Sequence, residues 1–427
     1  MTKLLRSLFI AFVLNVLFSS EGQAATIINA VNCSAAAVLA AVNAAPDGGT
    51  VAIPACPGGV SWPTTLTVTK GITVQGAGIG VTVLLDGVPK GDAMCANANP
   101  MIRFTGASPA RWRLTALTIR GSATDLGCQP GHVAIGGTSK AWRVDHVRIE
   151  NQQTVGIRIG GDTWGVIDHT DFEGNHKQGV IVSHFTWGGR TYGDGSWADP
   201  LYLGTERAVY IEDCTFTDPN PSGAGAVDMF DGGRVVFRYN TAAFMGNHGT
   251  DSSGRRRSAR SYEIYNNTFT AWAPAAFTAI LLRGGTGVIY NNTFKGDYVD
   301  IINATNYRDT QSFPPWGRCD GKSPYDQNQS PTGYACIDQV GRSTGDLLSG
   351  DTPPPAWPTQ ALEPVYQWSN MKNGANNPVL SSLSSNIQVN RDFFNNMIKP
   401  GYTAFPYPHP LTLSGPRPSP PTNVRAQ

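Results

Sequence analysis

The segment from 248 to 260, HGTDSSGRRRSAR, concentrates residues whose types can do chemistry. It holds His248, Asp251, Arg255, Arg256, Arg257 and Arg260. Charged residues make up only 15% of the 427 residues and the formal net charge is +1, so this concentration of cations is local. Guanidinium groups bind carboxylates through paired hydrogen bonds. The segment therefore predicts a site for an anionic ligand, with His248 as a group that can move a proton.

A second segment, residues 174–207, combines proton-active side chains with aromatic rings. Its candidates are Lys177, Arg190, Tyr192, Trp187 and Trp197. Tyrosine is a reasonable acid for a leaving oxygen, and indole rings can stack on the faces of sugars. The alternative is a loop that packs its tryptophans onto the wall of the fold.

Two carboxylates, Asp228 and Asp231, precede the arginine-rich segment. Alignment of the repeats described below places Asp228 one repeat from Arg255, and Asp231 one repeat from Ser258. The carboxylates could pair with the arginines, or hold Ca²⁺, which favours several oxygen ligands. They could also serve a hydrolase as acid and base.

An internal repeat shows which elements must position these residues. Related stretches begin at residues 144, 167, 211, 237, 264 and 289, running from VDHVRI to two copies of IYNNTF. The intervals are 23, 44, 26, 27 and 25 residues, and the second is about two repeats long. Apolar residues alternate with polar ones in each stretch, which indicates strands. Because so short a unit buries its apolar side only against its neighbours, we expect an all-β solenoid of stacked parallel strands.

Equivalent positions of the repeat predict stacks of like side chains. The expected stacks are an asparagine ladder of Asn240, Asn267 and Asn292, a core stack of Phe172, Phe216, Phe269 and Phe294, and a structural pair of His146 and His169. Asparagines bonded along a turn and stacked aromatic rings are typical of a β-solenoid.

The chain divides into five predicted parts. Residues 1–24 resemble a signal peptide, because Lys3 and Arg6 precede an apolar run and small residues follow at 22 and 24. Residues 25–109 would form an N-terminal cap, with a helix at 34–45, and the first coils. Residues 110–305 would form the β-helix core, residues 306–411 a C-terminal wrapping region, and residues 412–427 a flexible tail. We expect no membrane association after signal cleavage, and a secreted or periplasmic protein.

Seven cysteines fit an exported protein, in which disulfides are stable. Their clustering suggests the pairs Cys33–Cys56, Cys95–Cys128 and Cys319–Cys336, although spacing does not prove connectivity. Cys214 is left over within a strand pattern, and we expect it to be a buried thiol.

The sequence resembles the secreted right-handed parallel β-helix proteins of the pectate lyase-like superfamily. The resemblance rests on AAPDGGTVAIP with GITVQGAG, the IYNNTF repeats, GGRVVFRYN followed by HGTDSSGRRRSAR, and YPHPL at 407–411. It implies a single-stranded right-handed parallel β-helix. The superfamily includes lyases, hydrolases, epimerases and binding proteins, so fold alone does not determine the reaction.

The resemblance and the cations together favour a lyase that cleaves an acidic, uronic-acid-containing polysaccharide by β-elimination. The expected base is His248, Arg257 or Arg260, with the arginines facing a groove, and Lys177 or Tyr192 is a candidate acid. Arg255, Arg256, Arg190, Trp187, Trp197 and Asp251 would bind the substrate, and Asp228 and Asp231 are candidate Ca²⁺ ligands. A glycoside hydrolase and a non-catalytic glycan-binding protein are the alternatives. We expect a monomer that binds no nucleic acid, because the chain lacks a basic excess.

Overall fold

The computed structural model describes residues 26–91, 98–122, 128–152, 154–174, 178–217, 225–251, 257–323, 326, 336–345, 360–376 and 380–413. The predicted signal peptide, residues 414–427 of the predicted flexible tail, and three predicted site residues (Lys177, Arg255 and Arg256) lie outside these ranges, whereas residues 412 and 413 of that tail belong to a helix.

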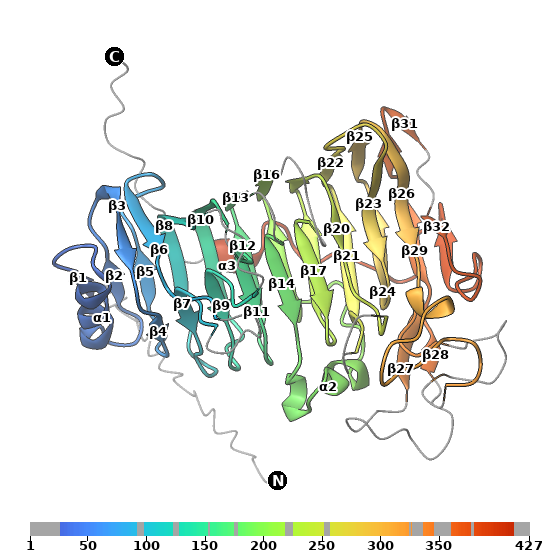
Figure 1. The fold of residues 1–427 in the computed structure, drawn as a ribbon, viewed down its shortest axis with the longest axis horizontal. Coiled ribbons are helices and arrows are strands. Elements are labelled where there is room, and N and C mark those ends of the chain that lie inside the picture. Colours follow the sequence, from blue (N-terminus) through green and yellow to red (C-terminus); the bar gives the residue numbers. More distant parts are fainter. Residues whose placement is uncertain are drawn as a thin grey trace, which may run out of the picture.

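The chain forms an elongated right-handed parallel β-helix with three strand-lined sides, here called faces 1, 2 and 3 (Figure 1). Face 1 consists of β1 (Ile27–Asn29), β2 (Thr50–Ala52), β5 (Thr73–Gln75), the first part of β8 (Arg113–Arg120) and of β10 (Trp142–Glu150), β12 (Gly165–Asp168), β15 (Val209–Glu212), β18 (Arg234–Arg238), β21 (Ser261–Tyr265), β24 (Thr286–Tyr290), β29 (Val365–Trp368) and β33 (Phe393–Asn395). Each strand pairs in parallel with the next, as in the register Ile167↔Ile211. The predicted fold class is therefore confirmed.

Faces 2 and 3 complete each coil. Face 2 consists of β3 (Cys56–Trp62), β6 (Thr82–Asp86), the second part of β8 and β10, β13 (Asp171–Glu173), β16 (Thr215–Thr217), β19 (Thr241–Ala242), β22 (Thr268–Thr270), β25 (Thr293–Lys295) and β30 (Met371–Lys372). Face 3 consists of β4 (Leu66–Val68), β7 (Ile102–Phe104), β9 (Val133–Ile135), β11 (Ile157–Ile159), β14 (Val180–Ser183), β17 (Val227–Phe230), β20 (Met245–Gly246), β23 (Ala276–Leu282), β26 (Tyr298–Ala304) and β32 (Leu380–Ser382). Alternate residues of these strands, except β30, point into one continuous apolar core.

The bend between faces 1 and 2 explains the repeated asparagines. At this bend one residue per coil has a left-handed backbone, for example Asn266 with φ 57°. The next residue is the ladder asparagine: Asn267 Nδ2 donates to Asn292 Oδ1 at 2.9 Å, and Asn292 Nδ2 donates to Asn370 Oδ1 at 3.0 Å. The predicted ladder is confirmed and extends one coil further, to Asn370.

The predicted ring stacks are also present. Phe172 and Phe216 stack with centroids 4.6 Å apart, and Phe269 and Phe294 stack at 5.3 Å. Ala242 occupies the register position between Phe216 and Phe269, which divides the four rings into two pairs. The parallel rings of His146 and His169 lie 5.1 Å apart at the bend, as expected.

The N-terminal end is closed by α1 (Ala35–Ala44), at the predicted position. The Ser34 side chain accepts a hydrogen bond from the Ala37 N–H at the helix start. Lys70 Nζ donates to three carbonyl groups at the helix end, including that of Ala45 at 2.7 Å. This arrangement covers the open apolar end of the first coil.

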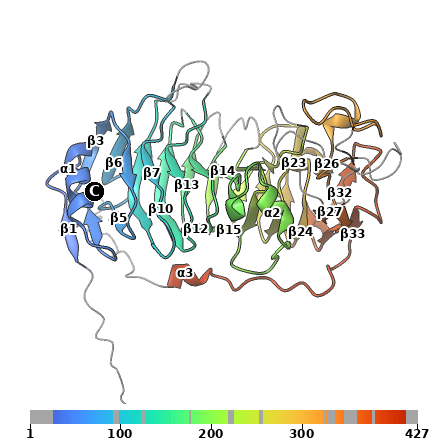
Figure 2. The same ribbon diagram turned by 90° about the horizontal axis from the view of Figure 1, so that it is seen from below.

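The coils continue beyond the predicted limit at residue 305. After the insertion that contains η2 (Tyr307–Asp309), β27 (Arg342–Gly345) and β28 (Gln360–Leu362), strand β29 pairs with β24 and β32 pairs with β26. The insertion hides these coils because it breaks the regular interval. Residues 396–413, here called the C-terminal strap, leave the coils and run back outside face 1 to α3 (Pro410–Leu413), as Figure 2 shows.

Two of the predicted disulfides, Cys33–Cys56 and Cys319–Cys336, are present. Cys128 is also disulfide-bonded, while its expected partner Cys95 lies outside the described residues. Cys214 is a buried free thiol, as predicted. Among the helices that the structure describes, none has the length and apolar character needed to span a membrane.

Candidate functional site

Face 3 presents a row of outward-pointing side chains that ends in a carboxylate. Arg158 on β11, Ile181 on β14 and Asp228 on β17 share one register position on consecutive coils. Their strand neighbours Ile157, Val180 and Val227 point into the core. Arg158 is half-buried, and its Nη1 donates to the Gln129 carbonyl at 2.9 Å. The strand pattern therefore places one cation and one buried carboxylate on the side of the sheet that faces away from the core, two strands or about 10 Å apart.

His248 lies beside this row on the next coil. Its backbone N–H donates to the Met229 carbonyl at 2.8 Å, which continues the strand pairing from β17. Its Nδ1 lies 3.0 Å from Asp228 Oδ2, and the two side chains are 28% and 2% exposed. Asp228 Oδ1 is buried and has no hydrogen-bond partner among the residues that the structure describes. A buried carboxylate thus orients the imidazole through Nδ1, while part of the ring remains accessible to solvent.

The surroundings of this pair are apolar on one side. The ring of Phe230 lies 6.0 Å from that of His248, and Phe230 clusters with Val155 and Ile181. Low polarity near a proton-transfer group strengthens its interaction with a neighbouring charge. The geometry suits a histidine that takes a proton while Asp228 stabilises the resulting imidazolium.

The two aspartates predicted as Ca²⁺ ligands have different partners. Asp231 Oδ2 accepts a hydrogen bond from Ser183 Oγ at 3.2 Å, whereas Asp228 contacts His248. No group of three or more carboxylate, histidine or cysteine side chains suited to a metal occurs in the described part of the chain. Ca²⁺ binding stays a prediction, and no step is assigned to a metal.

Arg257 does not face a groove, contrary to the prediction. It is 1% exposed; its Nε and Nη2 bind the two oxygens of Asp338 at 2.6 and 2.7 Å, and its Nη1 binds Asp194 at 2.6 Å. Burial lowers the pKa of Arg257, but both carboxylates outweigh it and the pKa lies above its usual value. A guanidinium held in this way cannot act as a base. Asp338 comes from the insertion after β26, which the local sequence pattern does not reveal.

The predicted groove position of Arg260 is also wrong. Its side chain is fully buried, its Nη2 donates to the Asp199 carbonyl at 3.0 Å, and its guanidinium lies 4.9 Å from the Trp197 ring centroid. Burial lowers its pKa to about 9, so the group remains protonated at neutral pH. Arg260 fastens the loop that contains α2 (Asp194–Ala198) to the solenoid.

The tryptophans of that loop do not offer stacking surfaces. Trp187, in η1 (Trp187–Gly189), and Trp197 are both buried. Trp187 Nε1 donates to Asp199 Oδ2 at 3.0 Å, and Trp197 Nε1 donates to the Ser258 carbonyl at 3.1 Å. The alternative reading, a loop packed on the solenoid wall, is therefore correct.

Asp251 is another corrected assignment. Its carboxylate is buried, lies 2.8 Å from the Arg283 guanidinium and accepts the Tyr307 backbone N–H at 3.0 Å. These bonds join the 248–260 link to the insertion after β26. The residue is structural and is not positioned to bind a substrate.

Arg190 and Tyr192 are the predicted site residues of this loop that retain access to solvent. Tyr192 is half-buried, has a left-handed backbone with φ 62°, and packs edge-on against Phe185 at 5.2 Å. The structure gives neither residue a contact with His248. The sequence pattern predicts Asp228 beside the arginines, whereas the structure pairs it with His248. The alternation of apolar and other residues in GIRIGG (156–161) and GVIVSH (179–184) is the signal that places Arg158 and Ile181 away from the core.

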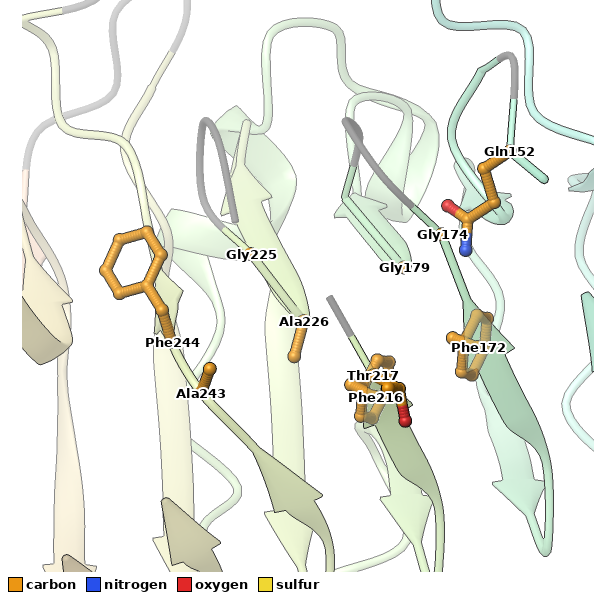
Figure 3. A pocket seen from close by; sticks show the side chains of 10 residues that line it. All are labelled: Gln152, Phe172, Gly174, Gly179, Phe216, Thr217, Gly225, Ala226, Ala243 and Phe244. Carbon is orange, nitrogen blue, oxygen red and sulfur yellow. The ribbon is translucent and has the colours of Figure 1, made fainter. Parts of the chain in front are cut away.

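A small slot at the bend between faces 2 and 3 is not a catalytic site. It has a volume of about 20 Å³ and is lined mainly by rings and glycines, including Phe172, Phe216, Phe244, Gly174 and Gly179 (Figure 3). That volume is about enough for one water molecule. A Cβ at Gly179 would lie 2.6 Å from the Phe216 ring, so the glycine provides room for that stacked ring.

The chain matches no protein-family model and no curated protein sequence. Among solved structures it is similar to pectin methylesterase PemA from Erwinia chrysanthemi, with 9% identity and a TM-score of 0.36 over 84% of this chain and 92% of that one. A pectin methylesterase mutant in complex with a hexasaccharide gives 10% identity and a TM-score of 0.37, over 81% and 88% of the two chains. The catalytic domain of a GH87 α-1,3-glucanase in complex with nigerose gives 10% and 0.32, over 88% and 68%. At these values the architecture of the chain rests on its own strand pairings.

Proposed function

We propose that this protein is an exported, monomeric polysaccharide lyase that cleaves an acidic, uronic-acid-containing glycan by β-elimination, with His248 as the base. One observation supports the proposal. The imidazole of His248 is partly exposed, and its Nδ1 lies 3.0 Å from Oδ2 of the buried Asp228 on face 3. The disulfides fit export to an oxidising compartment.

The reaction would use the pair as follows. Because Asp228 contacts Nδ1, His248 Nε2 would take the C5 proton of a uronate unit, and Asp228 would stabilise the imidazolium. The electrons of the C5–H bond form the C4–C5 double bond as the C4–O bond breaks, and the leaving oxygen takes a proton from an acid or from water. Tyr192 and Lys177 remain candidates for that acid.

The substrate carboxylate needs a cation, because C5 is acidic only when the neighbouring charge is neutralised. Arg158 lies on the same face of the sheet as Asp228 and is suited to this role, although its Nη1 is already bonded to Gln129. Arg255 and Arg256 follow His248 by only a few residues and remain candidates for the same role. The charge that polarises the substrate would thus come from side chains.

A glycoside hydrolase of this fold is less well supported. Inverting and retaining hydrolases use two carboxyl groups that both reach the glycosidic bond. Asp228 and Asp231 are both buried, and Asp231 is hydrogen-bonded to Ser183. Neither is presented to a substrate as His248 is.

The test is a panel of acidic polysaccharides, with the ultraviolet absorbance of unsaturated uronate ends as the readout. We expect His248→Ala to lower kcat by roughly 10²–10⁴-fold on the responsive glycan, with Asp228→Asn also impaired. His169→Asn is the matched control, because His169 also contacts an aspartate, Asp168 at 2.9 Å, but lies at the opposite bend and asparagine tolerates its left-handed backbone.

Three outcomes would contradict the proposal. Full activity in a folded His248→Ala variant would place the base elsewhere. New reducing ends without new absorbance would indicate a hydrolase. Binding of an acidic glycan with no cleavage of any member of the panel would indicate a non-catalytic glycan-binding protein.

A further inference from the structure

A second pocket lies between the solenoid and the C-terminal strap, and its lining includes neither His248 nor its neighbours Asp228 and Phe230. Its volume is about 310 Å³, near the lower end of ligand pockets. One wall comes from turns between faces 3 and 1 and the other from the strap, which α3 anchors against β10 and β12 (Figure 2). The lining residues used below are Arg111, Lys140, Trp164, Glu206, Phe405 and His409.

His409 supplies this pocket with a fixed hydrogen-bond donor. The residue is 4% exposed, its backbone N–H donates to Glu212 Oε1 at 2.8 Å, and its ring Nδ1 accepts the Leu411 N–H at 3.1 Å. Burial and then the nearby Arg238 lower its pKa to about 4, so the ring is neutral at pH 7 and carries its proton on Nε2. No described residue accepts a hydrogen bond from that Nε2, although the side chain is almost wholly buried.

The charges of the lining are incompletely paired. Arg111 and Glu206 are exposed, and neither side chain has an ion-pair or hydrogen-bond partner among the described residues. Lys140 Nζ donates to the Asp162 side chain and carbonyl and lies 3.9 Å from the Trp164 ring centroid. An ammonium group has three donors, so one of them remains for a ligand. The pocket therefore offers several donors and one acceptor.

The remaining lining is apolar. Phe405 contributes a half-buried ring, and Pro109, Pro410 and Leu411 contribute aliphatic surface; Trp164 is 9% exposed with Lys140 over its ring and forms part of the wall. A ligand that fits must combine an anionic group with hydroxyl groups and a carbon–hydrogen face. Carboxylates pair with arginine through its planar fork, and sugar rings present an apolar face to aromatic and aliphatic side chains.

We propose that this pocket is a second glycan-binding site, which takes one or two carboxylated sugar units independently of His248. The sugar carboxylate binds Arg111 and the free donor of Lys140, a ring hydroxyl accepts from His409 Nε2, and Glu206 accepts from another hydroxyl. Because Phe405 and His409 belong to the strap, a bound sugar joins the strap to the turns beneath it. The site would hold a long acidic chain beside the solenoid without cleaving it.

The experiment compares D-galacturonate with D-galactose by isothermal titration calorimetry on the full-length protein. The two sugars differ by the carboxylate, and a monosaccharide has no glycosidic bond to cleave, so the result does not depend on the lyase proposal. We expect millimolar or tighter binding of galacturonate, no comparable binding of galactose, and at least a tenfold weaker affinity for galacturonate in Arg111→Ala. Arg120→Ala is the matched control, because Arg120 is a partly exposed arginine on face 2.

His248→Ala separates the two sites and should bind galacturonate like the unchanged protein. The proposal is overturned if galacturonate does not bind at millimolar concentration, if galactose binds equally well, or if Arg111→Ala binds as the control does. Loss of galacturonate binding in His248→Ala with full binding in Arg111→Ala would assign the ligand to face 3 instead. Arg111 is exposed, so its replacement should leave the fold intact, and circular dichroism checks this.

Discussion

Arginine serves two different purposes in this protein, and burial separates them. Arg257 and Arg260 are buried with carboxylates, carbonyl groups and an indole ring, whereas Arg158 and Arg111 keep part of their surface toward solvent. A buried guanidinium depends on such partners, since removing a charge from water is costly. Part of the charge in HGTDSSGRRRSAR therefore holds loops against the solenoid. Among the described residues of this segment, His248 is the proton-active residue that remains accessible.

Replacing Arg257 by alanine should destabilise the fold. Asp338 and Asp194 would be left buried without their cation, and breaking a buried pair in this way typically costs about 3–5 kcal/mol. Urea unfolding should show this loss, while Arg190→Ala, which removes an exposed arginine of the neighbouring loop, should change stability by no more than about 0.5 kcal/mol. If Arg257→Ala is as stable as the unchanged protein but inactive, the arginine serves the substrate after all.

At the scale of elements, the sequence predicts what is local and periodic. The IYNNTF repeats predict strands, their register and the asparagine ladder, because a stacked coil repeats the same environment at a fixed interval. The orientation of Arg257 could not be predicted, since it depends on Asp338, 81 residues away in an insertion without repeats. The same insertion concealed the coils that contain β29 and β33.

The strap is held to face 1 by a carboxyl group with an unusual pKa. Glu263 on β21 is buried, and its oxygens accept hydrogen bonds from the Gly204 N–H at 2.8 Å and from the Tyr402 hydroxyl at 2.5 Å. Burial raises the pKa of Glu263 to about 7, although these two bonds and Arg238 lower it in part. The folded protein therefore retains a proton on Glu263 at pH values where the unfolded chain releases it.

The free energy of unfolding should consequently fall as the pH rises from about 4.5, the ordinary pKa of a glutamate, to about 7, the pKa of Glu263 in the folded protein. Outside that window the contribution of Glu263 should be constant. The full effect is about 3 kcal/mol by proton linkage. The side chain introduced by Glu263→Gln cannot titrate. As the pH rises across this range, the variant should therefore gain stability relative to the unchanged protein, as measured by their unfolding free energies. Parallel pH profiles for the two proteins would show that Glu263 does not carry the shift.

At the scale of the whole molecule, the strap compensates for a weakness of solenoids. Each coil contacts only its neighbours, so distant coils are coupled weakly and can unfold separately. The strap joins remote coils: Arg238 Nη1 donates to the Phe405 carbonyl at 2.8 Å, and Arg143 Nη1 donates to that of Thr412, 269 residues away in sequence, at 3.3 Å. It also covers a row of rings on face 1 that includes Tyr210, Tyr265 and Tyr290.

Truncation after Pro400 should therefore lower cooperativity as well as stability. Without the strap, Arg238 and Glu212 lose bonds to its backbone while remaining on face 1, so β10, β12 and β15 should open more readily than β22 and β25 of face 2. Hydrogen exchange should show this selective loss of protection, and urea unfolding should show a broader transition. Truncation after Leu413 is the control, because it keeps every strap contact named here and should unfold like the full chain. A sharp, unshifted transition in the shorter variant would mean that the coils couple through their own stacking, and that the strap serves chiefly to form the pocket around His409.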